Sequence, residues 1–409
     1  MSEWQERMRM YENWKSKGLK LDMSRGKPGA DQLALSDDLL EARWVSPPMA
    51  EDGTECRNYG VLEGLPEMRR LFGELMGVAP EQVLVGGNAS LALMYDYLAQ
   101  CLLDGAGAAP WSQQGKVKFL CPVPGYDRHF SMLEQLGIEM ICVPMLAEGP
   151  DVALAEEVAK DPLVKGLICV PKYSNPEGKT YSAAAVRALA GMRTAAPDFR
   201  IIWDNAYCVH DLYDTADELL NLLEAAKECG TEDRVIEVTS FSKITFPGGG
   251  VAALAASPAN IAAIRRRMNV QTIGSDKLNQ LRHARYFQNL DGVQAHMRKH
   301  AAILRPKFET VLEILARDLT GVASWTIPRG GYFISLDLPD GTAARTHQLL
   351  KEAGVVLTPA GATFPYGRDP RDRNLRIAPT FPPIEELRQA AGLLTLCARI
   401  AALEKNGTV

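Results

Sequence analysis

Short apolar runs alternate with amphipathic segments through the first two thirds of the chain. The runs have the length of strands that are buried on both faces, and the segments between them have helical periodicity. The seven predicted strands cover residues 82–85, 116–122, 139–145, 165–170, 200–203, 235–239 and 251–256. Strands separated by helices predict an α/β fold with a mostly parallel seven-stranded sheet flanked by helices.

The two ends of the chain have a different pattern. Residues 1–20 predict an amphipathic helix that ends at Gly18, and a long helical stretch over 276–315 is softened near Pro306. Further strands are expected over 325–338, 355–358 and 374–379, and a closing helix over 385–403. We therefore expect a large domain over 50–290 and a smaller α+β domain that both termini build, from 1–49 and 291–409.

The composition is typical of a soluble globular protein, with 46% hydrophobic and 23% charged residues among 409. A net charge of −5 argues against a nucleic-acid partner. No apolar run approaches the roughly 20 residues that span a bilayer, and the N-terminus lacks the apolar segment of a signal peptide. The eight cysteines form no Cys-x-x-Cys pair, so we expect reduced thiols, no metal site and a cytoplasmic location.

Candidate chemistry centres on Lys243, which follows the apolar run 235–238 in the sequence Ser240-Phe241-Ser242-Lys243. Burial at the end of a strand disfavours the lysine ammonium, lowers its pKa and frees the amine as a nucleophile. Such an amine forms a Schiff base with an aldehyde cofactor. Taken alone, the pattern also fits a surface lysine with a buried stem.

Four further features fall at the ends of predicted strands. The turn at 86–90 joins a strand to a helix, and the free N–H groups of such a helix start favour phosphate. Tyr126 offers a flat ring, Asn175 an amide beside a proline, and Asp204 and Tyr207 a carboxylate and a phenol. Each has a plainer interpretation, since Tyr126 could simply pack, Asn175 could mark a turn and Asp204 could cap a helix.

Together these features meet one chemical demand. A pyridine aldehyde phosphate needs an anion cradle, a stacking ring, a lysine, a carboxylate for its ring nitrogen and donors for its phenolic oxygen. The carboxylate keeps the pyridine protonated, so that the ring can act as an electron sink. The set therefore predicts a site for pyridoxal 5′-phosphate (PLP).

The order of these motifs resembles the fold-type I PLP-dependent aminotransferases of the class I/II superfamily, from about residue 20 to residue 400. More narrowly, five motifs are similar to a bacterial aspartate aminotransferase subgroup sometimes labelled MocR-like. They are Ser24-Arg25-Gly26-Lys27-Pro28, Asn58-Tyr59-Gly60, Gly86-Gly87-Asn88-Ala89-Ser90, Lys172-Tyr173-Ser174-Asn175-Pro176 and Ser242-Lys243-Ile244-Thr245-Phe246.

The resemblance implies a role for each candidate residue. Lys243 would hold PLP and act as general acid and base, Asp204 would pair with the pyridinium nitrogen, and Tyr126 would stack on the ring. Asn175 and Tyr207 would hydrogen bond the phenolic oxygen. The phosphate would be held by Asn88, Ala89, Ser90, Ser240 and Ser242. Arg376 would bind the substrate α-carboxylate with a two-pronged contact, next to Gly26 and Asn175. Tyr59 would reach the phosphate of a partner subunit, which implies a homodimer with shared sites.

One position departs from the family pattern. Many relatives carry a phosphate-binding arginine about eight residues after the lysine, where this chain has Gly250 or Val251. Lys277 and Arg282 are candidate replacements from a helix start, and solvated charges are the alternative interpretation for both.

The substrate pair is the least constrained prediction. The resemblance and the basic loop at Arg25 favour aspartate as donor and 2-oxoglutarate as acceptor, because a distal carboxylate in a partly dry pocket needs a cationic partner. Lys27 is the alternative partner, and either residue could instead be solvated. A PLP-dependent lyase or decarboxylase is a rival function on the same fold. The effector-binding domain of a regulator is a second rival, although few residues precede the first motif.

Overall fold

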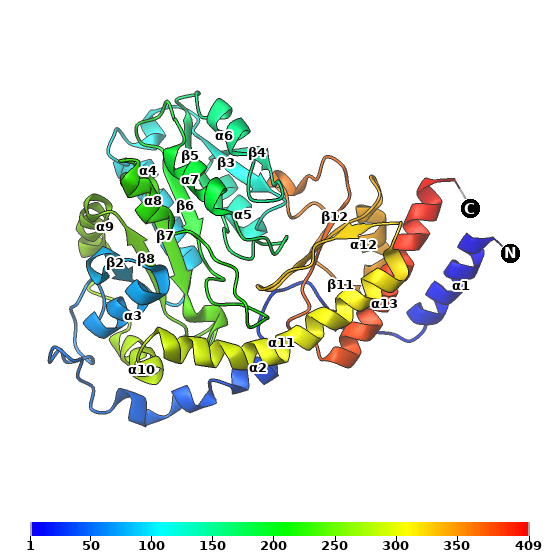
Figure 1. The fold of residues 1–409 in the computed structure, drawn as a ribbon, viewed down its shortest axis with the longest axis horizontal. Coiled ribbons are helices and arrows are strands. Elements are labelled where there is room, and N and C mark those ends of the chain that lie inside the picture. The colour runs from blue at the N-terminus through cyan, green and yellow to red at the C-terminus, as the bar shows by residue number, and fades with distance from the viewer. Residues whose placement is uncertain (1, 408–409) are drawn as a thin grey trace.

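The structure is a computed structural model that describes residues 2–407. Its centre is a seven-stranded sheet in the order β2-β8-β7-β6-β5-β3-β4 (Figure 1). The strands are β2 (Val83–Val85), β3 (Lys118–Val123), β4 (Glu139–Pro144), β5 (Val164–Cys169), β6 (Arg200–Asp204), β7 (Val235–Ser240) and β8 (Ala252–Ala256). Strand β8 is antiparallel to both neighbours and the other pairs are parallel. The predicted α/β fold is confirmed.

Helices cover both faces of this sheet, as the continuous apolar strands require. On β6, Ile202 faces a core shared with α4 (Ser90–Asp104) and α5 (Asp127–Gln135). The neighbouring residues Ile201 and Trp203 face a second core with the helices of the other face. The remaining helices around the sheet are α3 (Pro66–Met76), α6 (Val152–Val158), α7 (Ala183–Gly191), α8 (Leu222–Glu228), α9 (Pro258–Gln271) and α10 (Lys277–Phe287).

The second region is built from both ends of the chain. Strands β9 (Ser324–Trp325), β10 (Ile334–Asp337) and β12 (Asn374–Ile377) form an antiparallel sheet, and β1 (Leu21–Asp22) pairs with β11 (Val355–Val356). The helices of this region are α1 (Glu3–Lys15), α11 (Leu290–Leu319), α12 (Ala343–Glu352) and α13 (Ile384–Lys405). Figure 1 shows α1 beside α13, so the two termini lie at the same end of the molecule.

Two expected elements are divided in the structure. The helical stretch 276–315 is two helices, because Gln288 has a left-handed φ of 65° between α10 and α11, while Pro306 lies inside α11. The strand expected over 325–338 is a hairpin of β9 and β10. Its turn contains Gly331 at φ 77°, and a side chain there would lie 2.8 Å from Cβ of Tyr173.

The segment after β1 runs from the second region towards the first. It contains α2 (Ala30–Ala34), η1 (Asp37–Leu40) and η2 (Ala42–Val45), and its last two turns pack against α10. Figure 1 shows this segment passing below α11. We propose residues 50–290 as the large domain and 1–49 with 291–409 as the small one, with residues 30–45 of the small domain forming an arm that reaches the large one.

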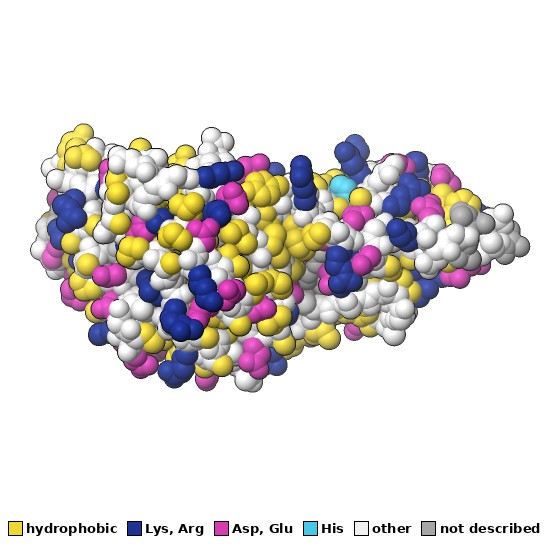
Figure 2. Space-filling model, turned by 90° about the horizontal axis from the view of Figure 1, so that it is seen from above, with side chains coloured by type: hydrophobic (Ala, Val, Ile, Leu, Met, Phe, Trp, Pro, Cys, Tyr) yellow, Lys and Arg dark blue, Asp and Glu magenta, His cyan; other side chains and the backbone are white. Residues whose placement is uncertain are grey.

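The molecule is elongated and narrows towards the end that carries α1 (Figure 2). On the face shown, basic and acidic side chains are interspersed rather than separated into patches of one sign. No helix within residues 2–407 is long and apolar enough to cross a membrane. The same residues contain no cluster of metal-binding side chains.

Candidate active site

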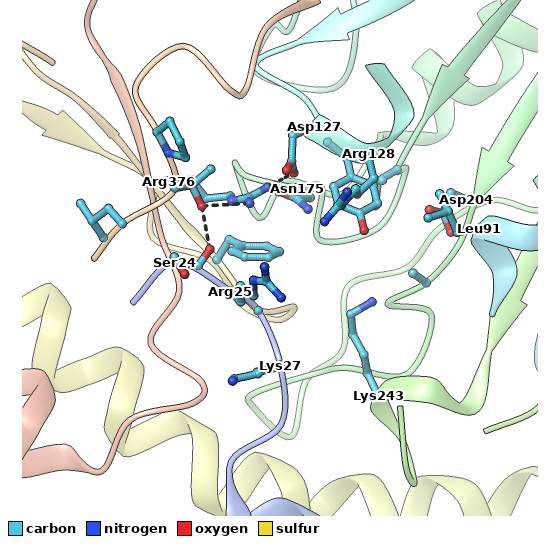
Figure 3. A pocket seen from close by; sticks show the side chains of 18 of the residues that line it. Ser24, Arg25, Lys27, Leu91, Asp127, Arg128, Asn175, Asp204, Lys243 and Arg376 are labelled. Carbon is cyan, nitrogen blue, oxygen red and sulfur yellow. Dashed lines mark hydrogen bonds and ion pairs between the residues drawn. The ribbon is translucent and has the colours of Figure 1, made fainter. Parts of the chain in front are cut away.

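A cavity of about 620 Å³ opens between the two regions, beyond the carboxyl ends of β6 and β7. Asp204 and Lys243 line it from the large sheet, and Arg25, Phe333 and Arg376 line it from the opposite side. Figure 3 shows Lys243 pointing into the space between Asp204 and Arg25. Chain segments that are far apart in sequence therefore meet around one enclosed volume.

Lys243 stands at the end of the short turn η6 (Phe241–Lys243), directly after β7. Its Nζ lies 5.0 Å from the ring centroid of Tyr207. Burial lowers the pKa of Lys243, and the nearby Asp204 carboxylate opposes part of that shift. A lysine in these surroundings holds a larger fraction of neutral, nucleophilic amine than a solvated lysine does.

Asp204 ends β6 and is 3% exposed. Its Oδ2 lies 3.0 Å from Nε2 of His129, a buried residue in the first turns of α5. Its Oδ1 is buried and has no hydrogen-bond partner among residues 2–407. A buried carboxylate oxygen without a donor is costly, so this atom fits a ligand that brings a proton, such as a protonated pyridine nitrogen.

The cavity also reaches a helix start suited to an anion. Helix α4 begins at Ser90, which lines the cavity, and no described side chain caps its first N–H groups. Ser242 Oγ donates to the Asn88 carbonyl at 2.6 Å, and the Asn88 amide donates to Pro247. These bonds join the turn at Asn88 and Ala89 to the lysine loop, and Ser240 ends β7 beside it.

Three further predicted residues line the same cavity. Tyr126, Asn175 and Tyr207 all line the cavity. Burial, with a contribution from Asp204, raises the pKa of Tyr126 to about 12. Burial also raises the pKa of Tyr207 well above its usual value, so both phenols are protonated donors at neutral pH.

Arg376 on β12 is buried and extensively hydrogen bonded. Its Nη1 donates to Asp127 Oδ1 at 2.7 Å and to Asn175 Oδ1 at 3.1 Å, and its Nη2 donates to Thr358 Oγ1 at 3.0 Å. The guanidinium also lies 4.8 Å from the Phe333 ring centroid. Its orientation is therefore fixed before any ligand binds.

The loop at residues 24–27 forms the exposed wall of the cavity. Arg25 and Lys27 are exposed at its mouth, and Lys27 lies over the Phe381 ring. Gly26 lies so close to Phe333 that an added Cβ would be 2.3 Å from the ring, so this position requires glycine. The basic residues Arg128 and Lys351 also line the cavity, and the sequence alone did not identify them as site residues.

His129 and Asp127 were missed as well. Both lie within three residues of the predicted Tyr126, and their signal was the first turn of a helix that follows a strand end. Their partners, Asp204 and Arg376, lie 75 and 249 residues away in sequence. Local spacing therefore placed them near the site without assigning them a contact.

Gly250, one of the two positions that depart from the family pattern, has no room for a side chain. A Cβ on Gly250 would lie 2.9 Å from the Ser242 main-chain nitrogen, so no side chain fits there. Lys277 donates instead to the Gly60 carbonyl and lines a separate cavity with Tyr59. Arg282 does not line the cavity that contains Lys243. Neither candidate replacement is brought to the helix start of α4.

Comparison with known proteins identifies the family. The profile of the family described as aspartate amino-transferase matches residues 2–408. An aspartate aminotransferase of Corynebacterium glutamicum is 47% identical over 97% of this chain and 93% of its own length.

Solved structures agree with that match. The crystal structure of an aspartate transaminase from Corynebacterium glutamicum has a TM-score of 0.96 at 46% identity, and covers 98% of this chain and 96% of that chain. An α-aminoadipate aminotransferase of Thermus thermophilus, complexed with N-(5′-phosphopyridoxyl)-L-leucine, has the same fold at 24% identity. Its TM-score is 0.76, with 96% of this chain and 94% of that chain covered.

Proposed function

The chain belongs to the aspartate aminotransferase family and is an aminotransferase, and we propose that it holds PLP on Lys243 and moves the amino group of aspartate to 2-oxoglutarate. The observation that carries the cofactor assignment is the unpartnered Oδ1 of Asp204. It lies in the same cavity as the half-buried Lys243 and an uncapped helix start. PLP has a complementary group for each of the three.

When bound, PLP supplies an electron sink that is conjugated to the substrate Cα. Asp204 would accept a hydrogen bond from the protonated ring nitrogen, and His129 fixes the orientation of that carboxylate. Once the substrate amine has displaced it from PLP, Lys243 would move the proton between the substrate Cα and the cofactor C4′, because its amine has a lowered pKa. Tyr126 stacks on the ring.

The remaining polar groups divide between the cofactor and the substrate. Asn175 and Tyr207 donate to the phenolic oxygen, and the turn of Asn88, Ala89 and Ser90, with Ser240 and Ser242, holds the phosphate. Arg376 binds the α-carboxylate with Gly26 and Asn175 beside it. Asp127 competes with that carboxylate only for Nη1 of Arg376, because Nε has no partner among residues 2–407 and is also available to the ligand.

The charge of the cavity supports a dicarboxylate substrate. Six basic side chains line it, Arg25, Lys27, Arg128, Lys243, Lys351 and Arg376, against the two carboxylates of Asp127 and Asp204. With Lys243 holding PLP and Arg376 binding the α-carboxylate, four basic side chains are left for the phosphate and for a distal carboxylate: Arg25, Lys27, Arg128 and Lys351. We assign the distal carboxylate to Arg25, for which no carboxylate of residues 2–407 lies within ion-pair distance.

We further propose a homodimer. Tyr59 is 81% exposed, and the nearby Ile273 is 63% exposed. Both line a cavity of about 520 Å³ that also contains Lys277 and does not contain Lys243. Exposed apolar side chains around a polar hollow are typical of a protein interface, and Tyr59 in that place suits the phosphate of a partner subunit. A monomeric mass by light scattering, with full turnover, would exclude this arrangement.

The decisive experiment is a screen of amino donors and 2-oxo acids, read from the absorbance of bound PLP and from the products. We expect aspartate to change the absorbance and 2-oxoglutarate to restore it, with glutamate formed in stoichiometric amount. Preference for an aromatic or aliphatic donor would overturn the substrate pair alone. Release of ammonia, pyruvate or CO₂ would indicate a lyase or decarboxylase, and protein without a PLP absorbance band would overturn the cofactor assignment.

A further inference from the structure

The main-chain carbonyls of Lys243 and Ile244 each lie within hydrogen-bond distance of a buried side chain from outside the large sheet. The Tyr332 hydroxyl donates to the Lys243 carbonyl at 3.3 Å. The Ile244 carbonyl lies 3.0 Å from Nε2 of His296 on α11. These carbonyls follow the short turn η6, where helical partners run out, so side chains complete their hydrogen bonds.

Gln32 on α2 connects Tyr332 to the arm. The Gly29 N–H donates to Gln32 Oε1 at 3.2 Å, which identifies the other end of the amide as the donor. That Nε2 donates to the Tyr332 hydroxyl at 3.1 Å and lies 3.0 Å from Nδ1 of His300. Gln32 is completely buried, so its amide has no water to replace a lost partner.

A histidine pair closes the network on its other side. His300 Nδ1 accepts from Gln32, so its ring proton is on Nε2, which lies 3.2 Å from Nε2 of His296. His296 Nε2 can accept from His300 or donate to the Ile244 carbonyl, but not both. Burial lowers the pKa of His296 and of His300 to about 4, so both rings are neutral at pH 7. Ser36, at 3.2 Å, adds a second contact from the arm to His296.

The arm follows the substrate loop, residues 24–29, which forms the exposed wall of the cavity. Residues 24–27 lead directly into Gly29 and α2, and the Lys27 carbonyl accepts from Thr380 at 3.0 Å. Tyr332 and its neighbour Phe333 contact different parts of the site. Tyr332 donates to the carbonyl of Lys243, whereas Phe333 packs on Gly26 and Arg376. A displacement of the loop therefore reaches the main chain of Lys243 through two hydrogen bonds, Gln32 to Tyr332 and Tyr332 to Lys243.

We propose that Gln32 and Tyr332 are positioning residues that couple the substrate loop 24–29 to the main chain of Lys243. The inference rests on the proposed role of Lys243 as the residue that holds PLP. Neither side chain lines the cavity, so both act through Lys243 rather than on the substrate. Closure of the loop on a substrate would then fix the amine that moves the proton.

The test uses the full-length PLP-loaded protein and three variants. Tyr332→Phe removes only the hydroxyl between Gln32 and Lys243, Gln32→Leu removes the amide, and the double variant removes both. Tyr11→Phe is the matched control, because its buried hydroxyl also donates to a main-chain carbonyl, that of Leu349 at 3.0 Å, and neither Tyr11 nor Leu349 lines the cavity. The readouts are the pH midpoint of the PLP absorbance change and the separate values of kcat and KM.

We expect Tyr332→Phe to shift the midpoint by about half a pH unit, the size of one lost hydrogen bond. We expect it to lower kcat roughly three- to ten-fold with little change in KM, whereas Tyr11→Phe changes none of these. Gln32→Leu should cause a similar shift, and the double variant should shift no further than the larger single change.

Each result decides a different point. An unchanged midpoint and kcat in Tyr332→Phe would overturn the inference even if Gln32→Leu fails to fold. Additive shifts in the double variant would show that Gln32 and Tyr332 act separately, which also overturns the coupling. Absence of the PLP band from the wild-type protein would instead overturn the proposed function.

Discussion

The two sides of the cavity are built in different ways. On the cofactor side, Asp204, Asn175 and Tyr207 are almost fully buried and come from the ends of strands in one sheet or the loops that follow them. On the substrate side, Arg25 and Lys27 are exposed and belong to a loop. Arg376 is the exception there, since it is buried and held by side chains.

This contrast follows from what each side has to do. The cofactor is the same in every cycle, so fixed dipoles in a dry environment stabilise it without reorganisation. The substrate alternates between a donor and an acceptor, so its distal end needs charge without rigid shape. An exposed arginine supplies that charge at a smaller desolvation cost than a buried one.

The largest effect is expected at the lysine. Lys243→Ala should lower turnover at least about 10⁴-fold, because no other group moves the proton at Cα, while circular dichroism shows an intact fold. Borohydride reduction followed by peptide mapping should label Lys243 in the wild type and no lysine in the variant. A labelled lysine elsewhere in the variant would show that a residue other than Lys243 holds PLP.

The second effect tests the buried carboxylate. Asp204→Asn keeps the shape of the side chain and removes the charge that holds the ring nitrogen protonated. PLP should still bind, and proton abstraction should slow by about 3 kcal/mol, roughly 10²-fold in single-turnover kinetics. The conservative control Asp204→Glu keeps the charge and should lose less. Near wild-type rates in the asparagine variant would contradict the assignment of Asp204 as ring partner.

The cofactor side was also the side that the sequence predicted well. Parallel strands bring their carboxyl ends to one edge, so Asp204 and Lys243 could be placed in one cavity from strand order alone, whereas Ser240 ends β7 without lining that cavity. Asn175 and Tyr207, in the loops after β5 and β6, follow the same rule. The seven strands and their flanking helices were predictable for the same reason, because buried parallel strands have a strong apolar signal.

The contacts that cross between regions could not be predicted. The pairs Asp127–Arg376 and Gln32–Tyr332 join segments more than 200 residues apart, and no local pattern determines which side chains meet across such a distance. The expected helix over 276–315 failed for a local reason, since the break falls at Gln288, a residue that seldom adopts a positive φ. Gly330 and Gly331, in the turn of the β9–β10 hairpin, are a turn signal in the sequence. The prediction of strand over 325–338 followed the apolar pattern instead.

The third effect tests the exposed charge. Arg25→Leu should lower kcat/KM for aspartate about 10- to 100-fold, the size of a lost hydrogen-bonded charge pair, and should change alanine turnover much less. Lys27→Leu is the matched control, because Lys27 belongs to the same loop and lies over Phe381. Equal losses for all donors in Arg25→Leu would make Arg25 a structural residue and remove the distal-carboxylate site from this loop.

The smallest effect concerns Asp127, which occupies one donor of Arg376, the residue that we propose binds the α-carboxylate of the substrate. Its Oδ1 lies 2.7 Å from Nη1 of Arg376, and its side chain is 29% exposed, so the pair is partly screened and contributes about 1 kcal/mol. Asp127→Asn should therefore lower KM roughly three- to five-fold, and by the same factor for aspartate and alanine, because both carry the α-carboxylate. Arg25→Leu discriminates between these donors, whereas Asp127→Asn should not. A higher KM in Asp127→Asn would mean that Asp127 orients Arg376 for binding instead of competing with the substrate. The α-carboxylate site would then depend on Asp127 as well as on Asn175 and Thr358.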